Sequence, residues 1–290
     1  MKNFLRCFII AAFCYGFIAC EKIIEVDVKD NQPKYFIEAY LFDELRNNVV
    51  YVRKTQNIFD DAPNQSILNA TVTIEEDSTV FPLSLTTSGY YNNQNLIGKS
   101  GSTYKLKVEV AGETFTATSV MPNKATYNDV IVALPLPLTA DGDTISPCSV
   151  GDYFIFNQFT DIADEKNFYL LDYNRFETTG STAQSTTDDQ IYIQDDLVFD
   201  GKTTCTPFFN TCFVEGQEVK TIMYNITEVM YKYYFVLSTV ANNGTPGGDV
   251  TPQNPKTNIE GGALGFFSTA SITRKTTKIE PITGFNPCTF

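Results

Sequence analysis

The cysteines are the residues of this chain whose spacing points most directly to chemistry. Cys20 closes the sequence Phe17-Ile18-Ala19-Cys20 after a short apolar run, as the lipid-accepting cysteine does in a bacterial lipobox. Lys2 and Arg6 supply the positive start of a signal peptide, and the apolar run is shorter than the roughly 20 residues that a membrane span needs. We therefore predict a lipoprotein signal peptide over residues 1–19. The alternative is an ordinary signal peptide that ends by chance before a cysteine.

Lipidation of Cys20 would add a diacylglycerol thioether and an amide-linked acyl chain such as palmitate. Each buried methylene contributes about 0.8 kcal/mol, so several chains would hold the protein at a membrane permanently. Residues 20–33 would then be a lipid-anchored tether.

Removal of the signal peptide and lipidation of Cys20 would leave four cysteines in an oxidising compartment, where they could form disulfides. They are Cys148, Cys205, Cys212 and Cys288. Four cysteines allow three pairings. The segment between Cys205 and Cys212 can reverse direction as a hairpin tip, so we predict this local bridge and a second one from Cys148 to Cys288. Free buried thiols are the alternative. A zinc site is disfavoured because no spacing is Cys-x-x-Cys.

A bridge from Cys205 to Cys212 would hold Phe208 and Phe209 at the tip of that hairpin. Two neighbouring aromatic rings in such a place are candidates for contact with a partner protein. The more common behaviour of such rings is to fold back over the core.

The composition excludes several classes of function. The chain has no histidine, which rules out Ser-His-Asp and Cys-His catalysis and every histidine-ligated metal site. It also has no tryptophan. Its net charge of -13 repels phosphate backbones, so nucleic-acid binding is not expected. No motif singles out a catalytic pair of carboxylates. We therefore expect a protein that is not an enzyme and has no cofactor and no metal.

The acidic and glycine-rich motifs favour structural roles. Asp141-Gly142-Asp143 lacks the downstream glutamate of a calcium loop, and the acids around Asp161 and around Asp195 are predicted to be solvated turns. The glycines of residues 261–265 are better suited to close backbone packing than to a phosphate. Ser78 and Thr144 lie in three-residue patterns that resemble the O-glycosylation signal of periplasmic and surface proteins.

The hydrophobic pattern predicts a mainly β protein. Alternating residues predict strands near 35–41, 49–53, 70–75, 80–85, 104–110 and 114–120, which together describe an antiparallel β-sandwich of immunoglobulin or fibronectin type over residues 34–122. A second β-rich domain is expected over residues 123–290, with strands near 153–160, 168–176, 190–199, 218–226 and 263–272. Residues 178–189 are expected to be an exposed loop, and residues 227–241 one helix capped by Asn225.

Several short segments, in their order along the chain, resemble the Bacteroidota outer-membrane lipoproteins of domain of unknown function 4249. They are Tyr40-Leu41-Phe42-Asp43-Glu44, Ala70-Thr71-Val72-Thr73-Ile74, Gly101-Ser102-Thr103-Tyr104-Lys105-Leu106, Asp164-Glu165-Lys166-Asn167-Phe168-Tyr169, Phe199-Asp200-Gly201, and residues 258–267. The resemblance implies an immunoglobulin-like first half and a family-specific second half. It also implies a role beside a TonB-dependent outer-membrane receptor, because members are commonly encoded next to such receptors. It assigns no catalytic residues.

The sequence leaves two functions open. The first is a non-enzymatic outer-membrane lipoprotein that is an accessory of a TonB-dependent receptor, and the second is a free-standing surface module that binds glycan or peptide. In either case we expect an outer-membrane location with a slight preference for the cell surface.

The anchor can be tested by fractionation of cells that produce the Cys20→Ala variant. Because the lipid on Cys20 is the feature expected to hold so acidic a chain at a membrane, the variant should move to the soluble fraction while the wild type stays with the membranes. Retention of the variant after a carbonate wash would contradict the prediction.

Overall fold

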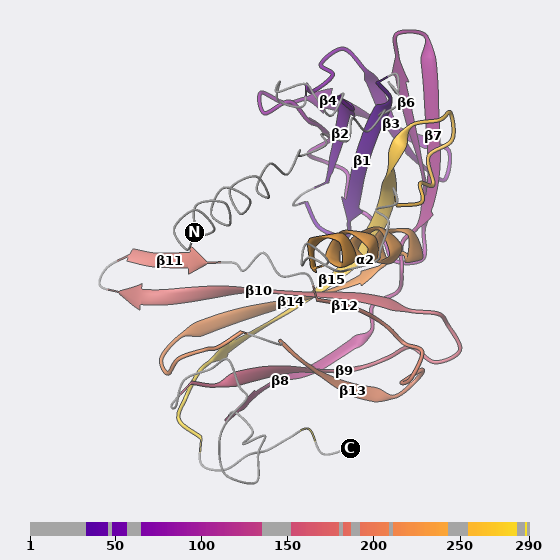
Figure 1. Cartoon of the computed structure of the whole chain (residues 1–290). Helices are drawn as coiled ribbons and strands as arrows, with labels where there is room; N and C mark the ends of the chain where they lie inside the picture. The colour runs from indigo at the N-terminus through magenta and orange to yellow at the C-terminus, as the bar shows by residue number, and fades with distance from the viewer. Residues whose placement is uncertain are drawn as a thin grey trace, which may run out of the picture. The chain divides into compact units, whose positions relative to one another are not determined.

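The computed structural model describes residues 33–45, 48–56, 65–134, 152–179, 182–186, 192–208, 211–242, 255–282 and 288 (Figure 1). All of them belong to one unit that spans Pro33–Phe290. The described residues are mainly β, with one α-helix, α2 (Glu228–Asn242), which confirms the predicted fold class. Within these ranges, no helix has the length and apolar character that a membrane crossing requires.

The strands of the first half follow the predicted alternation; they are β1 (Tyr35–Phe42), β2 (Val49–Lys54), β3 (Thr71–Glu76), β4 (Thr79–Leu85), β5 (Tyr91–Asn92), β6 (Thr103–Val110) and β7 (Glu113–Val120). Those of the second half are β8 (Thr126–Ala133), β9 (Phe154–Thr160), β10 (Phe168–Thr179), β11 (Thr182–Thr186), β12 (Tyr192–Asp195), β13 (Thr203–Pro207), β14 (Glu218–Ile226) and β15 (Leu264–Lys278). The sequence did not reveal β5, β8 or β13, and β11 lies in the segment expected to be a loop.

The strands form two sheets. The larger has 12 strands in the order β11-β10-β14-β15-β1-β2-β5-β4-β3-β6-β7, with β12 also paired to β10. The smaller has 3 strands in the order β13-β9-β8. Because β1 and β15 are parallel and the other pairs are antiparallel, the large sheet is mixed.

Two tight turns set the register of the first half. Asp77 and Ser78 join β3 to β4 with φ angles of 44° and 71°, and Ala111 and Gly112 join β6 to β7 with φ angles of 50° and 82°. Positive φ at both central residues is the conformation that matches the twist of a two-residue hairpin. Each turn lies between two strands that were predicted from the sequence.

The first core lies inside the strands β1 to β7. Alternate residues of β6 are buried, and they belong to one cluster with buried residues of β1 and β3, among them Leu106, Ile37 and Ile74. The end of the sheet at β7 meets the segment before β15, where Thr116 and Glu260 exchange backbone hydrogen bonds of 3.3 and 2.7 Å. The strands therefore enclose this core as a β-sandwich.

Strand β15 belongs to both halves of the molecule. Its residues 264–270 pair with β1, and its residues 270–278 pair with β14. Figure 1 shows this yellow strand running from beside β1 to beside β14. The predicted domain boundary at residue 122 falls between β7 and β8, and strands from both sides of it share the large sheet through β15.

The second core lies between the two sheets of the second half. Tyr169 and Tyr173 of β10 pack there with Phe159 of β9 and Met223 of β14. The hydroxyl of Tyr127 on β8 donates to Asn157 Oδ1 at 2.5 Å and is also hydrogen-bonded to Thr221 Oγ1 at 2.6 Å, so this phenol keeps its polar contacts inside the core.

Helix α2 covers the other face of the large sheet. Tyr233 lies 4.5 Å from the ring of Phe266 on β15, and Met230 is buried in the same cluster. The predicted cap is wrong: Asn225 is buried in β14, where its Oδ1 accepts a hydrogen bond from the Ala125 N–H. Thr227 is the cap instead, because its Oγ1 accepts from the Met230 N–H three residues on.

Gly265 provides a test of the contact between β1 and β15. It has φ +96°, and an added Cβ would lie 2.0 Å from the Ile37 carbonyl oxygen, whereas Gly262, with φ +91°, has nothing within 4 Å of that position. Gly265→Ala should lower the free energy of unfolding by about 3 kcal/mol or more, because the new Cβ adds a clash to the strain of a positive φ. Gly262→Ala should lower it by about 1–2 kcal/mol, because only the positive φ is unfavourable there. Equal losses in denaturant titrations of the two variants would show that the close approach is not a constraint.

Candidate functional site

The structure places one of the residues predicted to be modified. Ser78 occupies the second position of the β3–β4 turn and is exposed, so its hydroxyl is accessible; its O-glycosylation stays a prediction. Cys20, Thr144, Cys148 and Phe209 lie outside the described residues.

The predicted disulfide pairing is wrong. Cys205 is bonded to Cys288, with their Cα atoms 6.1 Å apart, so neither can join Cys212 or Cys148. Cys212 is itself disulfide-bonded. Cys205 lies in β13, where it pairs with Gln158 of β9, and this extended ladder prevents the tight reversal that a bridge to Cys212 would need.

Phe208 is a core residue and not a partner contact. Its side chain has no exposed surface, and its ring centroid lies 4.7 Å from that of Tyr173 and 5.0 Å from that of Tyr192. The alternative that this ring folds back over the second core is therefore correct.

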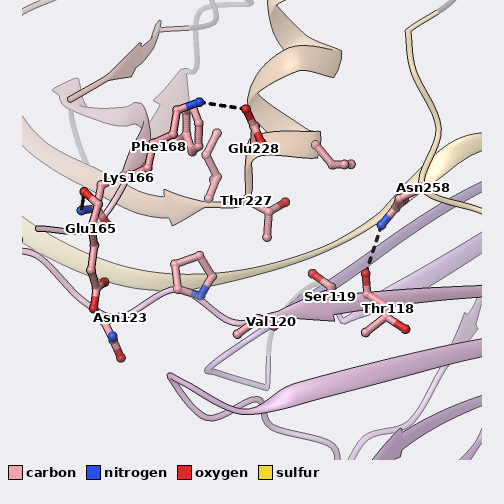
Figure 2. A pocket seen from close by; sticks show the side chains of 14 residues that line it. Thr118, Ser119, Val120, Asn123, Glu165, Lys166, Phe168, Thr227, Glu228 and Asn258 are labelled. Atoms are coloured by element: carbon pink, nitrogen blue, oxygen red, sulfur yellow. Dashed lines mark hydrogen bonds and ion pairs between the residues drawn. The ribbon is translucent and has the colours of Figure 1, made fainter. Parts of the chain in front are cut away.

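A cleft of about 430 Å³ lies where the two halves of the chain meet. Its lining comes from the end of β7 and the segment after it, the loop before β10, the end of β14, the first turn of α2, and Asn258. Figure 2 shows side chains from these separate segments around one space. The apolar part of the wall includes Val120, Phe168 and Val229.

Asn258 holds one wall of this cleft together. Its Nδ2 donates to the Phe267 carbonyl at 2.9 Å, and its Oδ1 accepts from the Phe267 N–H at 3.0 Å, as a neighbouring strand would. The same Nδ2 lies 3.3 Å from the Thr118 carbonyl of β7, the contact drawn in Figure 2. This side chain joins β7 to β15 and is a positioning group.

An ion-pair chain crosses the other wall. Lys166 Nζ lies 2.9 Å from Glu228 Oε1 at the start of α2 (Figure 2). Lys232 Nζ lies at the same distance, 2.9 Å, from that oxygen. Hydrogen bonds from Lys166 and then Lys232 hold the pKa of the Glu228 carboxyl below its ordinary value, and the same contact raises the pKa of Lys166. The partial positive charge at the N-terminus of the helix also stabilises a carboxylate at this position.

Three carboxylates meet next to the cleft, which the sequence did not indicate. Side-chain oxygens of Asp161, Asp196 and Asp200 all lie within 4.8 Å of one another. Asp161 and Asp196 are buried, so they are not the solvated turns that the sequence predicted. Oxygen ligands of this kind suit a hard cation such as calcium.

Protein donors already occupy these carboxylates. Asp161 accepts from the Tyr169 hydroxyl and, at 2.8 Å, from the Gly201 N–H, while Asp196 accepts from the Asn167 N–H at 2.6 Å. Asp200 accepts from the Asp164 N–H at 3.1 Å. The carboxylates therefore fasten the loop before β10 to the turn after β12.

The phenol of Tyr169 acts as a hydrogen-bond donor in this cluster. Burial, followed by the hydrogen bond to Asp161, raises the pKa of Tyr169 far above its ordinary value. The group therefore stays protonated at neutral pH and is not a nucleophile.

Comparison with protein families gives a match over most of the chain. A family described as Domain of unknown function (DUF4249) matches residues 21–276, which is most of the chain. No curated protein matches the chain.

Asp161→Asn tests the role of the buried carboxylate. Asparagine keeps one acceptor oxygen for the two donors, Tyr169 Oη and Gly201 N, so we expect a loss of about 1–3 kcal/mol in the free energy of unfolding. Asp164→Asn is the matched control, because Asp164 is exposed and asparagine tolerates its φ of 63°. Equal melting temperatures for Asp161→Asn and the wild type would contradict the prediction.

Proposed function

Because this chain belongs to the family of the domain of unknown function DUF4249, we propose that it is a non-enzymatic outer-membrane lipoprotein that partners a TonB-dependent receptor. The observation that carries the proposal is the Phe17-Ile18-Ala19-Cys20 sequence, since a lipid on Cys20 would place the folded residues beside integral proteins of the same membrane. The net charge of -13 supports this arrangement, because the acidic chain would be repelled by anionic head groups and would depend on its anchor.

The chemistry of the cleft supports binding in place of catalysis. The polar groups of Asn258 and Asn167 that line it are held in hydrogen bonds to the backbone, and Lys166 is paired with Glu228. Groups bound in this way shape a surface but are not poised to transfer protons. The chain as a whole also lacks histidine, the most common general base.

A free-standing glycan- or peptide-binding module is the second candidate. The volume of the cleft, about 430 Å³, lies within the range of small-ligand sites, and its wall combines apolar groups with an ion pair. Binding of a ligand from a glycan or peptide array by purified protein, without any receptor, would favour this function. Val120→Ser, in the apolar wall of the cleft, should then weaken that binding.

The partner proposal can be tested by purification from native membranes. After gentle solubilisation, pull-down of the full-length chain should recover a large β-barrel receptor in stoichiometric amount, because the lipid anchor keeps both proteins in the same bilayer. The Cys20→Ala variant is the control, and its yield of receptor should fall. If the wild type never recovers such a receptor, the proposal is wrong.

A further inference from the structure

The turn after β12 exposes two large apolar side chains side by side. Leu197 and Val198 are 84% and 82% exposed, while no other large apolar side chain of the described residues exceeds 59%. Single exposed aliphatic residues are normal on protein surfaces, but an adjacent pair at the tip of one turn is a candidate contact with a partner.

The turn that carries this pair is fixed on both sides. Before the pair, the buried Asp196 binds the Asn167 backbone through its own N–H at 3.2 Å and through its carboxylate. After the pair, the Phe199 N–H donates to the Asp196 carbonyl at 2.9 Å, and the Phe199 ring is buried against Phe159. A partner that bound Leu197 and Val198 would therefore not have to order the backbone first.

Exposed acidic side chains lie on the turn that carries the pair and on the segment hydrogen-bonded to this turn. Asp164, Glu165 and Asp200 are exposed on the two segments that the carboxylate cluster fastens together. Of the nearby lysines, Lys166 is paired with Glu228, and Lys202 is exposed. Three exposed carboxylates stand against two lysines, one of which is paired with Glu228, so the net charge of these two segments is negative.

We propose that Leu197 and Val198 are the anchor of an interface with a protein partner that offers an apolar pocket rimmed by lysine or arginine. Such a pocket would bury both aliphatic side chains, and its basic rim would meet Asp164, Glu165 and Asp200. A second copy of the chain fits less well, because two acidic turns would repel each other, and so does an anionic lipid surface. The inference rests on the proposed function for the existence of a partner, and it adds where and by what chemistry the partner binds.

The first test is photo-crosslinking in native cells. A benzophenone amino acid at position 197 of the full-length chain should give one adduct with another protein, and the crosslinked peptide of that protein should contain apolar residues next to lysine or arginine. Position 80 is the control, because Val80 is also an exposed aliphatic residue, at 55%, but lies on β4. An adduct with a second copy or with lipid, equal adducts from both positions, or no adduct would overturn the proposal.

The second test measures the affinity of the purified partner identified in this way. Leu197→Ser and Val198→Ser should each weaken binding on the order of tenfold with an unchanged melting temperature, and Val80→Ser should have no effect. Asp164→Asn with Glu165→Gln should slow association and reduce its salt dependence, whereas Glu113→Gln on the distant β6–β7 hairpin should not. Unchanged affinity in the serine variants would overturn the proposal.

The two proposals can fail separately. If a receptor co-purifies but residue 197 does not contact it and the serine variants bind it normally, the inference is wrong and the proposed function stands. If residue 197 contacts a protein with the stated pocket that is not a TonB-dependent receptor, the inference stands and the proposed function is wrong.

Discussion

The parallel pairing of β1 with β15 is the interaction on which the rest of this structure depends. It brings the end of the chain next to its first described strand, with Ile37 opposite Gly265. The absence of a side chain at Gly265 allows this approach, since a Cβ there would meet the Ile37 carbonyl. The same strand continues to β14, so β15 joins the strands around the first core to those around the second.

The sequence predicts those parts of the fold whose causes are local. The turn at Ala111 and Gly112 and the alternation of β6 are sufficient to define a hairpin, and the spacing of apolar residues is sufficient to define α2. The pairing of β1 with β15 has no local signal, because the two strands are far apart in the chain and either could pair elsewhere. The bridge between Cys205 and Cys288 is hidden for the same reason.

The candidate site was hidden because it is made at the ends of elements. Asp161 follows β9 and Asp196 follows β12, two strands of different sheets, and only the topology brings their carboxylates together. In the sequence each acid has the composition of a turn, and turns are usually solvated. Leu197 and Val198 were assigned to the end of a strand, where alternation would bury one of them. The buried Asp196 and Phe199 end that strand early and turn both side chains outward.

The position of β15 also determines the order in which the protein can be completed during synthesis. Phe36 pairs with Leu264 and Phe42 with Ala270, so the first sandwich lacks one neighbour of β1 until residues 264–270 are available. Contacts between such distant residues make folding slow, and a half-built sheet with an open edge is prone to aggregate. An incomplete chain of this topology, whether it leaves the ribosome or an export channel, therefore has an open edge at β1 until residues 264–270 arrive. A chaperone that shields this edge would protect it from aggregation.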